Sequence, residues 1–219
     1  MLQKNRGFTI VELAVSMAVI GILIGIGAVS WSAYVTWTED RSRESSAQQW
    51  ASTFDLYKSR YFSYPVMPTT ASTPAIVCLG AVGSFPTATT ATGGDRCGQF
   101  KTSGSSTSAS TSSSLTAEII KVGNMPKNPH EDGGRTIYES TLVGPLAHVS
   151  RSGNSGTVTV TAKIVVFLKD SCPASNGFLE ATSGNIATIL PGIASLKPST
   201  GPGSSAKVCY LEKSYSATL

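Results

Sequence analysis

The feature that most constrains this chain is a long apolar run near its amino terminus, which follows a short basic leader. The run covers residues 8–29, and Glu12 is its only charged residue. As an α-helix rising about 1.5 Å per residue, it is long enough to cross the ~30 Å hydrocarbon core of a bilayer. The leader, residues 1–7, carries Lys4 and Arg6, which favour a cytoplasmic amino terminus and export of the remainder.

Glu12 is a candidate functional residue because of where it stands. An ionisable side chain inside a membrane helix costs roughly 2.5–3.5 kcal/mol on insertion scales, so it normally has a partner and a role. Cleavage between Gly7 and Phe8 would create an ammonium group about one helical turn from Glu12. In a staggered assembly, that ammonium group of one copy would neutralise Glu12 of its neighbour. The alternative is a protonated Glu12 that faces lipid or headgroups near the membrane surface.

The segment GFTIVEL, residues 7–13, resembles the class III signal of type IV pilins and of the pseudopilins of type II secretion. The resemblance implies that a prepilin peptidase cuts after Gly7 and that Phe8 becomes the N-methylated terminus. It also implies that Glu12 acts in filament assembly. A secretory signal peptide fits poorly, because its cleavage site would follow the apolar run and not precede it.

The helix is expected to continue well past the apolar run. Residues 30–62 contain no proline and predict an amphipathic continuation of the same helix. Apolar side chains recur there at steps of three and four, namely Ala47, Trp50, Ala51, Phe54, Tyr57 and Tyr61. Pro65 and Pro68 are expected to end the helix. The charged residues 38–44 predict a solvated face, with subunit contacts in a filament as the alternative.

Residues 63–219 predict one exported globular head. Short strands joined by turns rich in glycine and proline predict an antiparallel β-sheet packed on the helix, so the fold class is α+β and resembles that of pilins. The low-complexity segment 101–114 predicts a mobile surface loop. The expected strands are residues 136–143, 148–151, 157–168 and 206–212.

All four cysteines lie in the part of the chain expected to be exported, where an oxidising compartment favours disulfides. More than one connectivity is possible. The pairs Cys78–Cys97 and Cys172–Cys209 are favoured because each closes a local, separate loop. By the resemblance to pilins, the second bond bounds a C-terminal disulfide loop, residues 172–209. A tetrahedral metal site is the alternative interpretation, but ligands spaced as C-x2-C are absent.

No catalytic residue, metal or cofactor is expected. His130 lies in an acidic turn, where solvent exposure explains it. The alternative is that Asn128, Glu131 and Asp132 coordinate calcium, as a loop does in major pseudopilins, although their spacing matches no EF-hand. Phosphate-binding and dinucleotide-binding motifs are absent from the sequence. The formal net charge of +4 is too small to predict a specific nucleic-acid partner.

Together with the resemblance, these features predict a non-enzymatic structural subunit of a type IV pilus or related filament. Its expected partners are other pilin subunits, the prepilin peptidase and an inner-membrane assembly platform. Before assembly it would be a single-pass protein of the cytoplasmic membrane, and afterwards part of an extracellular pilus or a periplasm-spanning filament. The alternatives are a type II secretion or competence pseudopilin acting as a minor subunit, and a membrane-anchored binding module or enzyme.

Overall fold

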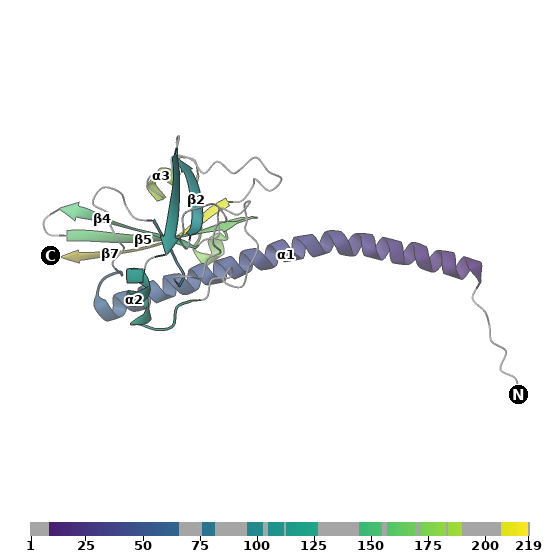
Figure 1. The fold of residues 1–219 in the computed structure, drawn as a ribbon, viewed down its shortest axis with the longest axis horizontal. Coiled ribbons are helices and arrows are strands. Elements are labelled where there is room, and N and C mark those ends of the chain that lie inside the picture. Colours follow the sequence, from purple (N-terminus) through teal and green to yellow (C-terminus); the bar gives the residue numbers. More distant parts are fainter. Residues whose placement is uncertain are drawn as a thin grey trace, which may run out of the picture. The chain divides into compact units, whose positions relative to one another are not determined.

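The computed structural model describes ten stretches of the chain: residues 9–65, 76–81, 96–102, 105–111, 113–126, 145–154, 157–169, 171–182, 184–189 and 207–218. The chain divides into two compact units, Met1–Glu39 and Asp40–Leu219. Helix α1, Ile10–Tyr61, contributes its first part to one unit and its second part to the other (Figure 1).

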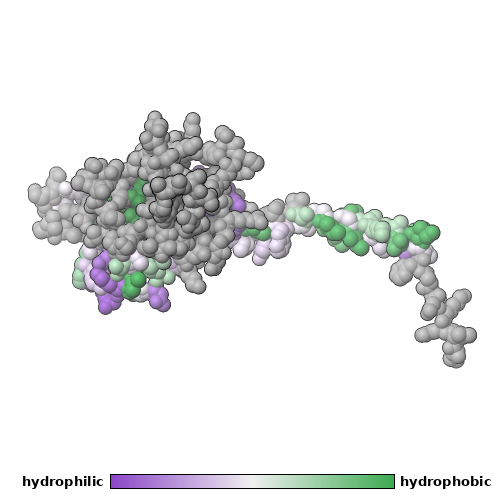
Figure 2. All heavy atoms as spheres, in the orientation of Figure 1, coloured by the Kyte–Doolittle hydropathy of each residue, from purple (hydrophilic) through white to green (hydrophobic). Residues whose placement is uncertain are grey.

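In the described residues, the first unit consists of Thr9 and of α1 up to Glu39, most of which is apolar. Its large apolar side chains between Ile10 and Ile26 are exposed, and Figure 2 shows them at the surface. Among the described residues, α1 is the one helix that is long and apolar enough to cross a membrane. Trp31, Tyr34 and Trp37 follow on successive turns, with ring centroids 6.2 and 6.3 Å apart. An exposed apolar helix of this kind is stable only against lipid or against other chains.

In the second unit, the predicted amphipathic stripe of α1 forms the centre of the core. Trp50 and Phe54 are fully buried, as is Ala47, and Ala51 and Tyr57 beside them are also buried. Tyr61, at the end of the stripe, is partly exposed. The helix ends there, before Pro65, because Phe62 takes a left-handed backbone conformation with φ of 56°.

The described part of the head contains a seven-stranded sheet in the order β2-β3-β1-β4-β5-β7-β6, which confirms the predicted α+β class. All strand pairs are antiparallel except β1 with β3, which is parallel. The strands are β1 (Ile76–Cys78), β2 (Arg96–Thr102), β3 (Ser105–Thr111), β4 (Leu146–Asn154), β5 (Thr157–Leu168), β6 (Leu179–Glu180) and β7 (Lys207–Thr218).

Three of the predicted strands are confirmed. Strand β5 has the predicted bounds, and β4 and β7 contain the predicted segments 148–151 and 206–212 except for residue 206. Both are longer than expected because each pairs along β5, with β7 matching it from Leu168↔Lys207 to Thr157↔Thr218. The fourth expected strand, residues 136–143, lies outside the described residues.

The prediction of a mobile surface loop over residues 101–114 is wrong. Ser105–Thr111 forms β3, which pairs with β2 on one side and β1 on the other, and Ser113 begins helix α2, Ser113–Ile120. A low-complexity segment has few distinctive side chains, but its backbone N–H and C=O groups can still pair with a neighbouring strand. Threonine also favours extended backbone, so a Ser- and Thr-rich segment is able to form a strand.

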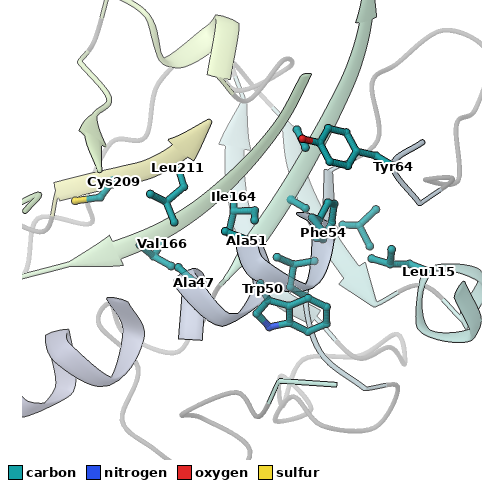
Figure 3. Packing of buried hydrophobic residues seen from close by; sticks show 14 of the residues in the cluster. Ala47, Trp50, Ala51, Phe54, Tyr64, Leu115, Ile164, Val166, Cys209 and Leu211 are labelled. Atoms are coloured by element: carbon teal, nitrogen blue, oxygen red, sulfur yellow. The ribbon is translucent and has the colours of Figure 1, made fainter. Parts of the chain in front are cut away.

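The core lies between α1 and one face of the sheet. Alternate residues of β5, from Val160 to Leu168, point toward Trp50 and Phe54, and Leu115 and Ile119 of α2 close one side. Figure 3 shows this packing around Trp50 and Phe54. On the other face, the Lys163 ammonium donates to the Thr188 carbonyl at 3.3 Å, which places the short helix α3 (Ile186–Ile189) there.

Candidate assembly site at the amino terminus

The first turn of α1 is closed by reciprocal hydrogen bonds between Thr9 and Glu12. The backbone N–H and the hydroxyl of Thr9 both donate to Oε2 of Glu12, each at 2.9 Å. In return, the backbone N–H of Glu12 donates to the Thr9 hydroxyl oxygen at 3.2 Å. This is a capping box, which satisfies backbone donors that have no partner inside the helix. The carboxylate of Glu12 therefore points back toward the amino terminus.

The two oxygens of the Glu12 carboxylate differ in their surroundings. Oε2 accepts both bonds from Thr9, whereas Oε1 accepts no hydrogen bond from the described part of the chain. A negative charge in the first turn is also favoured by the partial positive charge of the helix amino terminus. Glu12 is thus held by its own helix while one oxygen remains open to a cation.

The other candidate residues at this end, Gly7 and Phe8, lie outside the described residues. The structure places Thr9 directly before the helix, so a chain cut after Gly7 would carry its ammonium group one residue before the capping box. That ammonium group and the Glu12 carboxylate would then lie at the same end of each helix. The assembly role of these residues stays a prediction.

The remaining hydroxyls of the apolar helix are satisfied within it. Ser16 donates to the carbonyl of Glu12 at 2.7 Å, and Ser30 donates to the carbonyl of Ile26 at 3.0 Å. Such bonds to the preceding turn allow serine to lie in an apolar environment. The carboxylate of Glu12 is therefore the charged group that any environment around this helix must accommodate.

Three glycines in the apolar helix have no packing reason within the chain. A Cβ added at Gly21, Gly25 or Gly27 would meet nothing within 4 Å. Glycine inside a helix costs up to about 1 kcal/mol relative to alanine. Gly21 and Gly25 are four residues apart, a spacing that lets a second helix approach closely. Close contact with another helix would give these glycines a role.

Comparison with known protein families identifies this end of the chain. Residues 2–28 match the prokaryotic N-terminal methylation motif. The chain carries a prepilin-type methylation motif. This is the class III signal predicted from residues 7–13, and it marks a precursor of the type IV pilin or pseudopilin kind. No curated protein and no solved structure matches the chain.

The methylation motif and an exposed apolar helix together are consistent with membrane anchoring. The motif points to a structural protein of the pilin type, a class that is usually non-enzymatic. Such a protein generally polymerises with pilin subunits after processing. The motif covers the leader and the apolar helix but leaves the head, residues 63–219, without a matching relative.

A second group of charged residues was missed by the sequence reasoning. Asp40, Arg43 and Glu44 were expected on a solvated face, but all three are buried. Both oxygens of the Asp40 carboxylate accept the backbone N–H of Lys169, and Arg43 lies 3.5 Å from Asp40. Glu44 forms an ion pair with Arg41 at 2.8 Å. Asp40 thus fastens α1 to the end of β5, and the expectation of a solvated face is wrong for all three residues.

The predicted bond between Cys172 and Cys209 is present, with Cα atoms 5.4 Å apart. It ties β7 to the residues just before the 3₁₀ helix Ala174–Asn176, and so bounds the loop of residues 172–209. Cys78 is also disulfide-bonded. Its predicted pairing with Cys97 stays a prediction, because the Cys97 side chain lies outside the described ones.

The described part of the head contains one buried titratable histidine, His148 on β4. Neither of its ring nitrogens has a hydrogen-bond partner. Burial, followed by the nearby charge of Lys163, lowers the pKa of His148 to about 4. The ring is therefore neutral at neutral pH. His130 and the possible calcium ligands Asn128, Glu131 and Asp132 lie outside the described residues.

Proposed function

We propose that this chain is a structural subunit of a type IV pilus or a related filament. The prepilin peptidase cuts it after Gly7, Phe8 is N-methylated, and the mature chain polymerises through α1. The observation that carries the proposal is the coincidence of the methylation motif, residues 2–28, with an exposed apolar helix that holds a capped Glu12.

The apolar helix has to be covered both before and after assembly, by lipid in the membrane and by neighbouring helices in the filament. The large apolar side chains from Ile10 to Ile26 are half to almost fully exposed in the single chain. Each would gain about 25 cal/mol for every Å² of apolar surface removed from water, and lipid covers the same surface before assembly. Packing contacts between helices favour assembly, and the open positions at Gly21 and Gly25 allow close approach there.

Glu12 sets the axial position of each new subunit. Its Oε2 is held by Thr9, and its Oε1 accepts the methylated ammonium group of Phe8 from a neighbouring copy. Methylation leaves the positive charge in place. A subunit at the wrong height would leave both charges unpaired in an apolar surrounding, which is strongly unfavourable.

Before assembly, the subunit lies in the cytoplasmic membrane with its head exported, and the assembly platform and prepilin peptidase act on it there. A type II secretion or competence pseudopilin uses the same motif and helix, so the filament formed is either a pilus or a periplasm-spanning pseudopilus. An anchored binding module or enzyme would need neither cleavage after Gly7 nor a placed Glu12.

Mass spectrometry of the protein from filaments sheared off its native host tests the proposal. We expect a chain that begins with N-methylated Phe8, and Gly7→Ala should retain the leader. Leu2→Ala, a change within the leader away from the cleavage site, is the matched control and should be processed normally. A wild-type chain that still begins at Met1 and is found only in membranes would overturn the proposal in favour of an anchored module.

A further inference from the structure

Helix α1 changes composition along its exposed stretch. Residues 13–29 contain no aromatic side chain, whereas residues 30–38 contain three, namely Trp31, Tyr34 and Trp37. Figure 2 shows the same change, since the green of the first stretch gives way to paler spheres along the helix. After Glu12, the next charged residue is Glu39. The aromatic side chains are therefore confined to the end of a long uncharged stretch.

The three aromatic residues form a ladder on one side of the helix. They are spaced three residues apart, and neighbouring ring centroids lie 6.2 and 6.3 Å apart. Side chains with this spacing lie on successive turns of one helix face. Each residue is more than half exposed, from 53% at Trp37 to 68% at Trp31. We call Trp31, Tyr34 and Trp37 the aromatic ladder.

The hydroxyl groups on the same side of the helix are satisfied within it. Ser30 and Thr38 lie four residues before and after Tyr34. The Ser30 hydroxyl donates to the Ile26 carbonyl at 3.0 Å, and the Thr38 hydroxyl donates to the Tyr34 carbonyl at 2.8 Å. Such bonds allow this side of the helix to lie where water is scarce. The rings themselves combine a large apolar surface with one polar group each, the indole N–H or the phenol O–H.

The position of the aromatic ladder along the helix indicates which environment covers it. Trp31 follows Glu12 by 19 residues, or about 29 Å of helix, which matches the ~30 Å thickness of a hydrocarbon core. Trp37 lies about 9 Å further along, a distance comparable to one headgroup layer. With Glu12 at one boundary of the hydrocarbon core, the aromatic ladder begins at the other boundary and extends into the headgroups.

We propose that the aromatic ladder docks in the headgroup layer of the outer leaflet of the membrane. Tryptophan and tyrosine favour this layer, because their rings meet apolar surface while their polar groups stay hydrated. The helix then has a marker at each boundary, the carboxylate of Glu12 on the cytoplasmic side and the aromatic ladder on the outer side. This inference rests on the membrane stage of the proposed function, and it requires neither cleavage nor polymerisation.

A second copy of the chain is the competing occupant of the aromatic ladder. Aromatic side chains are also frequent anchors in protein interfaces, where they fill pockets of the partner. A contact between helices gives no reason for the rings to begin only one hydrocarbon thickness beyond Glu12. Their confinement to residues 31–37, directly before the charge of Glu39, therefore favours lipid headgroups over a second copy.

Quenching of tryptophan fluorescence in lipid vesicles tests the proposal. The full-length chain contains three tryptophans, and Trp50 is fully buried in the head. The chain is reconstituted in phosphatidylcholine vesicles whose acyl chains carry bromine either close to the headgroup or close to the bilayer centre. We expect bromine near the headgroup to remove more of the fluorescence of Trp31 and Trp37. The double variant Trp31→Phe with Trp37→Phe retains only Trp50 and should lose the quenching.

Ile22→Trp in the background of that double variant is the matched control. Ile22 is exposed on the same helix, so a larger side chain fits there. It follows Glu12 by ten residues, about 15 Å, and so lies near the middle of the hydrocarbon core. Fluorescence from this position should be quenched more strongly by bromine at the bilayer centre, the reverse of the result expected for the aromatic ladder.

Flotation of the vesicles in a density gradient reports membrane insertion separately from quenching. If the chain floats but Trp31 and Trp37 are quenched most from the bilayer centre, or by neither lipid, the proposal is overturned and the membrane stage stands. A chain that does not float overturns both. Quenching that appears only after the protein is diluted with more lipid would make the aromatic ladder a contact between copies, and the proposal would be wrong.

Discussion

The carboxylate of Asp40 accepts the backbone N–H of Lys169 with both of its oxygens, at 3.1 and 2.9 Å. Asp40 belongs to α1, and Lys169 is the first residue after β5. The contact joins the helix to the end of strand β5 in the central sheet. Because Asp40 and Arg43 are both buried, this contact lies in a low-dielectric surrounding in which loss of one charge is costly.

Replacing Asp40 with alanine should destabilise the head by about 3–5 kcal/mol, because Arg43 and the Lys169 N–H lose a buried partner. Chemical denaturation of the full-length chain in detergent, followed by circular dichroism, measures the loss. Asp55→Ala is the control, since its ion pair with Lys213 at 2.8 Å is exposed. It should cost less than about 1 kcal/mol. Equal losses of stability for the two variants would show that the Asp40 contact with Lys169 does not stabilise the head.

Replacing both Cys172 and Cys209 with serine should lower the stability of the head by roughly 3–4 kcal/mol, because their bond closes a long loop in the unfolded chain. The sequence separation of 37 residues sets the size of the effect. Thermal unfolding of the variant and of wild type, in the absence of reductant, measures the difference. Unfolding at the same temperature would show that other contacts already fix β7 in place.

The stability of the head should fall as the pH is lowered from about 6.5 toward 4. The pKa of His148 is lowered to about 4 in the folded chain, against about 6.5 when unfolded. Between these values the unfolded chain binds a proton that the folded chain excludes, so protonation favours unfolding, by up to about 3 kcal/mol. Above the unfolded pKa of about 6.5, the His148 ring is neutral in both states, and the folded chain loses no stability to its protonation.

The variant His148→Leu isolates this effect from that of the carboxylates. It removes the titrating ring and fills the same buried position, which lies opposite Lys163 in the pairing of β4 with β5. Urea unfolding at pH 7 and at pH 4.5 should show a smaller difference for the variant than for wild type. Parallel pH profiles would assign the acid sensitivity to groups other than His148.

Glu12→Val should leave cleavage after Gly7 intact but greatly reduce the yield of sheared filaments, because the Phe8 ammonium group of a neighbour loses its partner. Glu12→Asp, which keeps the charge at a shorter reach, should restore part of the yield. Ser16→Ala is the control, since its hydroxyl bonds only to the Glu12 carbonyl. A normal filament yield from Glu12→Val would remove the assembly role.

The sequence predicted well the features that depend on residues close together in the chain. The spacing of Trp50, Phe54 and Tyr57 predicts a buried helical stripe. The alternation of polar and apolar residues in 157–168, followed by a continuous apolar end, predicts β5. The Cys172–Cys209 bond followed from locality along the chain. In each case the information lies within the segment itself.

The features that it missed depend on partners far away in the chain. Asp40 is buried because its carboxylate accepts the backbone N–H of a residue 129 positions later in the chain. The charges around Asp40 in the sequence do not indicate that bond, since any residue type at position 169 except proline could donate it. Likewise, Ser105–Thr111 becomes a strand through pairing with β1 and β2, and nothing in its own side chains specifies those neighbours.

The strand order has a consequence for how the head is made. Strand β7 lies between β5 and β6, although it follows both in the chain. During synthesis β5 and β6 therefore leave the ribosome before the strand that lies between them. Until residues 207–218 are made, one edge of β5 has unpaired backbone groups that can pair with a wrong strand. The bond to Cys172 must wait for Cys209 in the same strand. Completion of the sheet is thus a late event in the folding of the chain, and a head interrupted before β7 would lack the strand that joins β5 to β6.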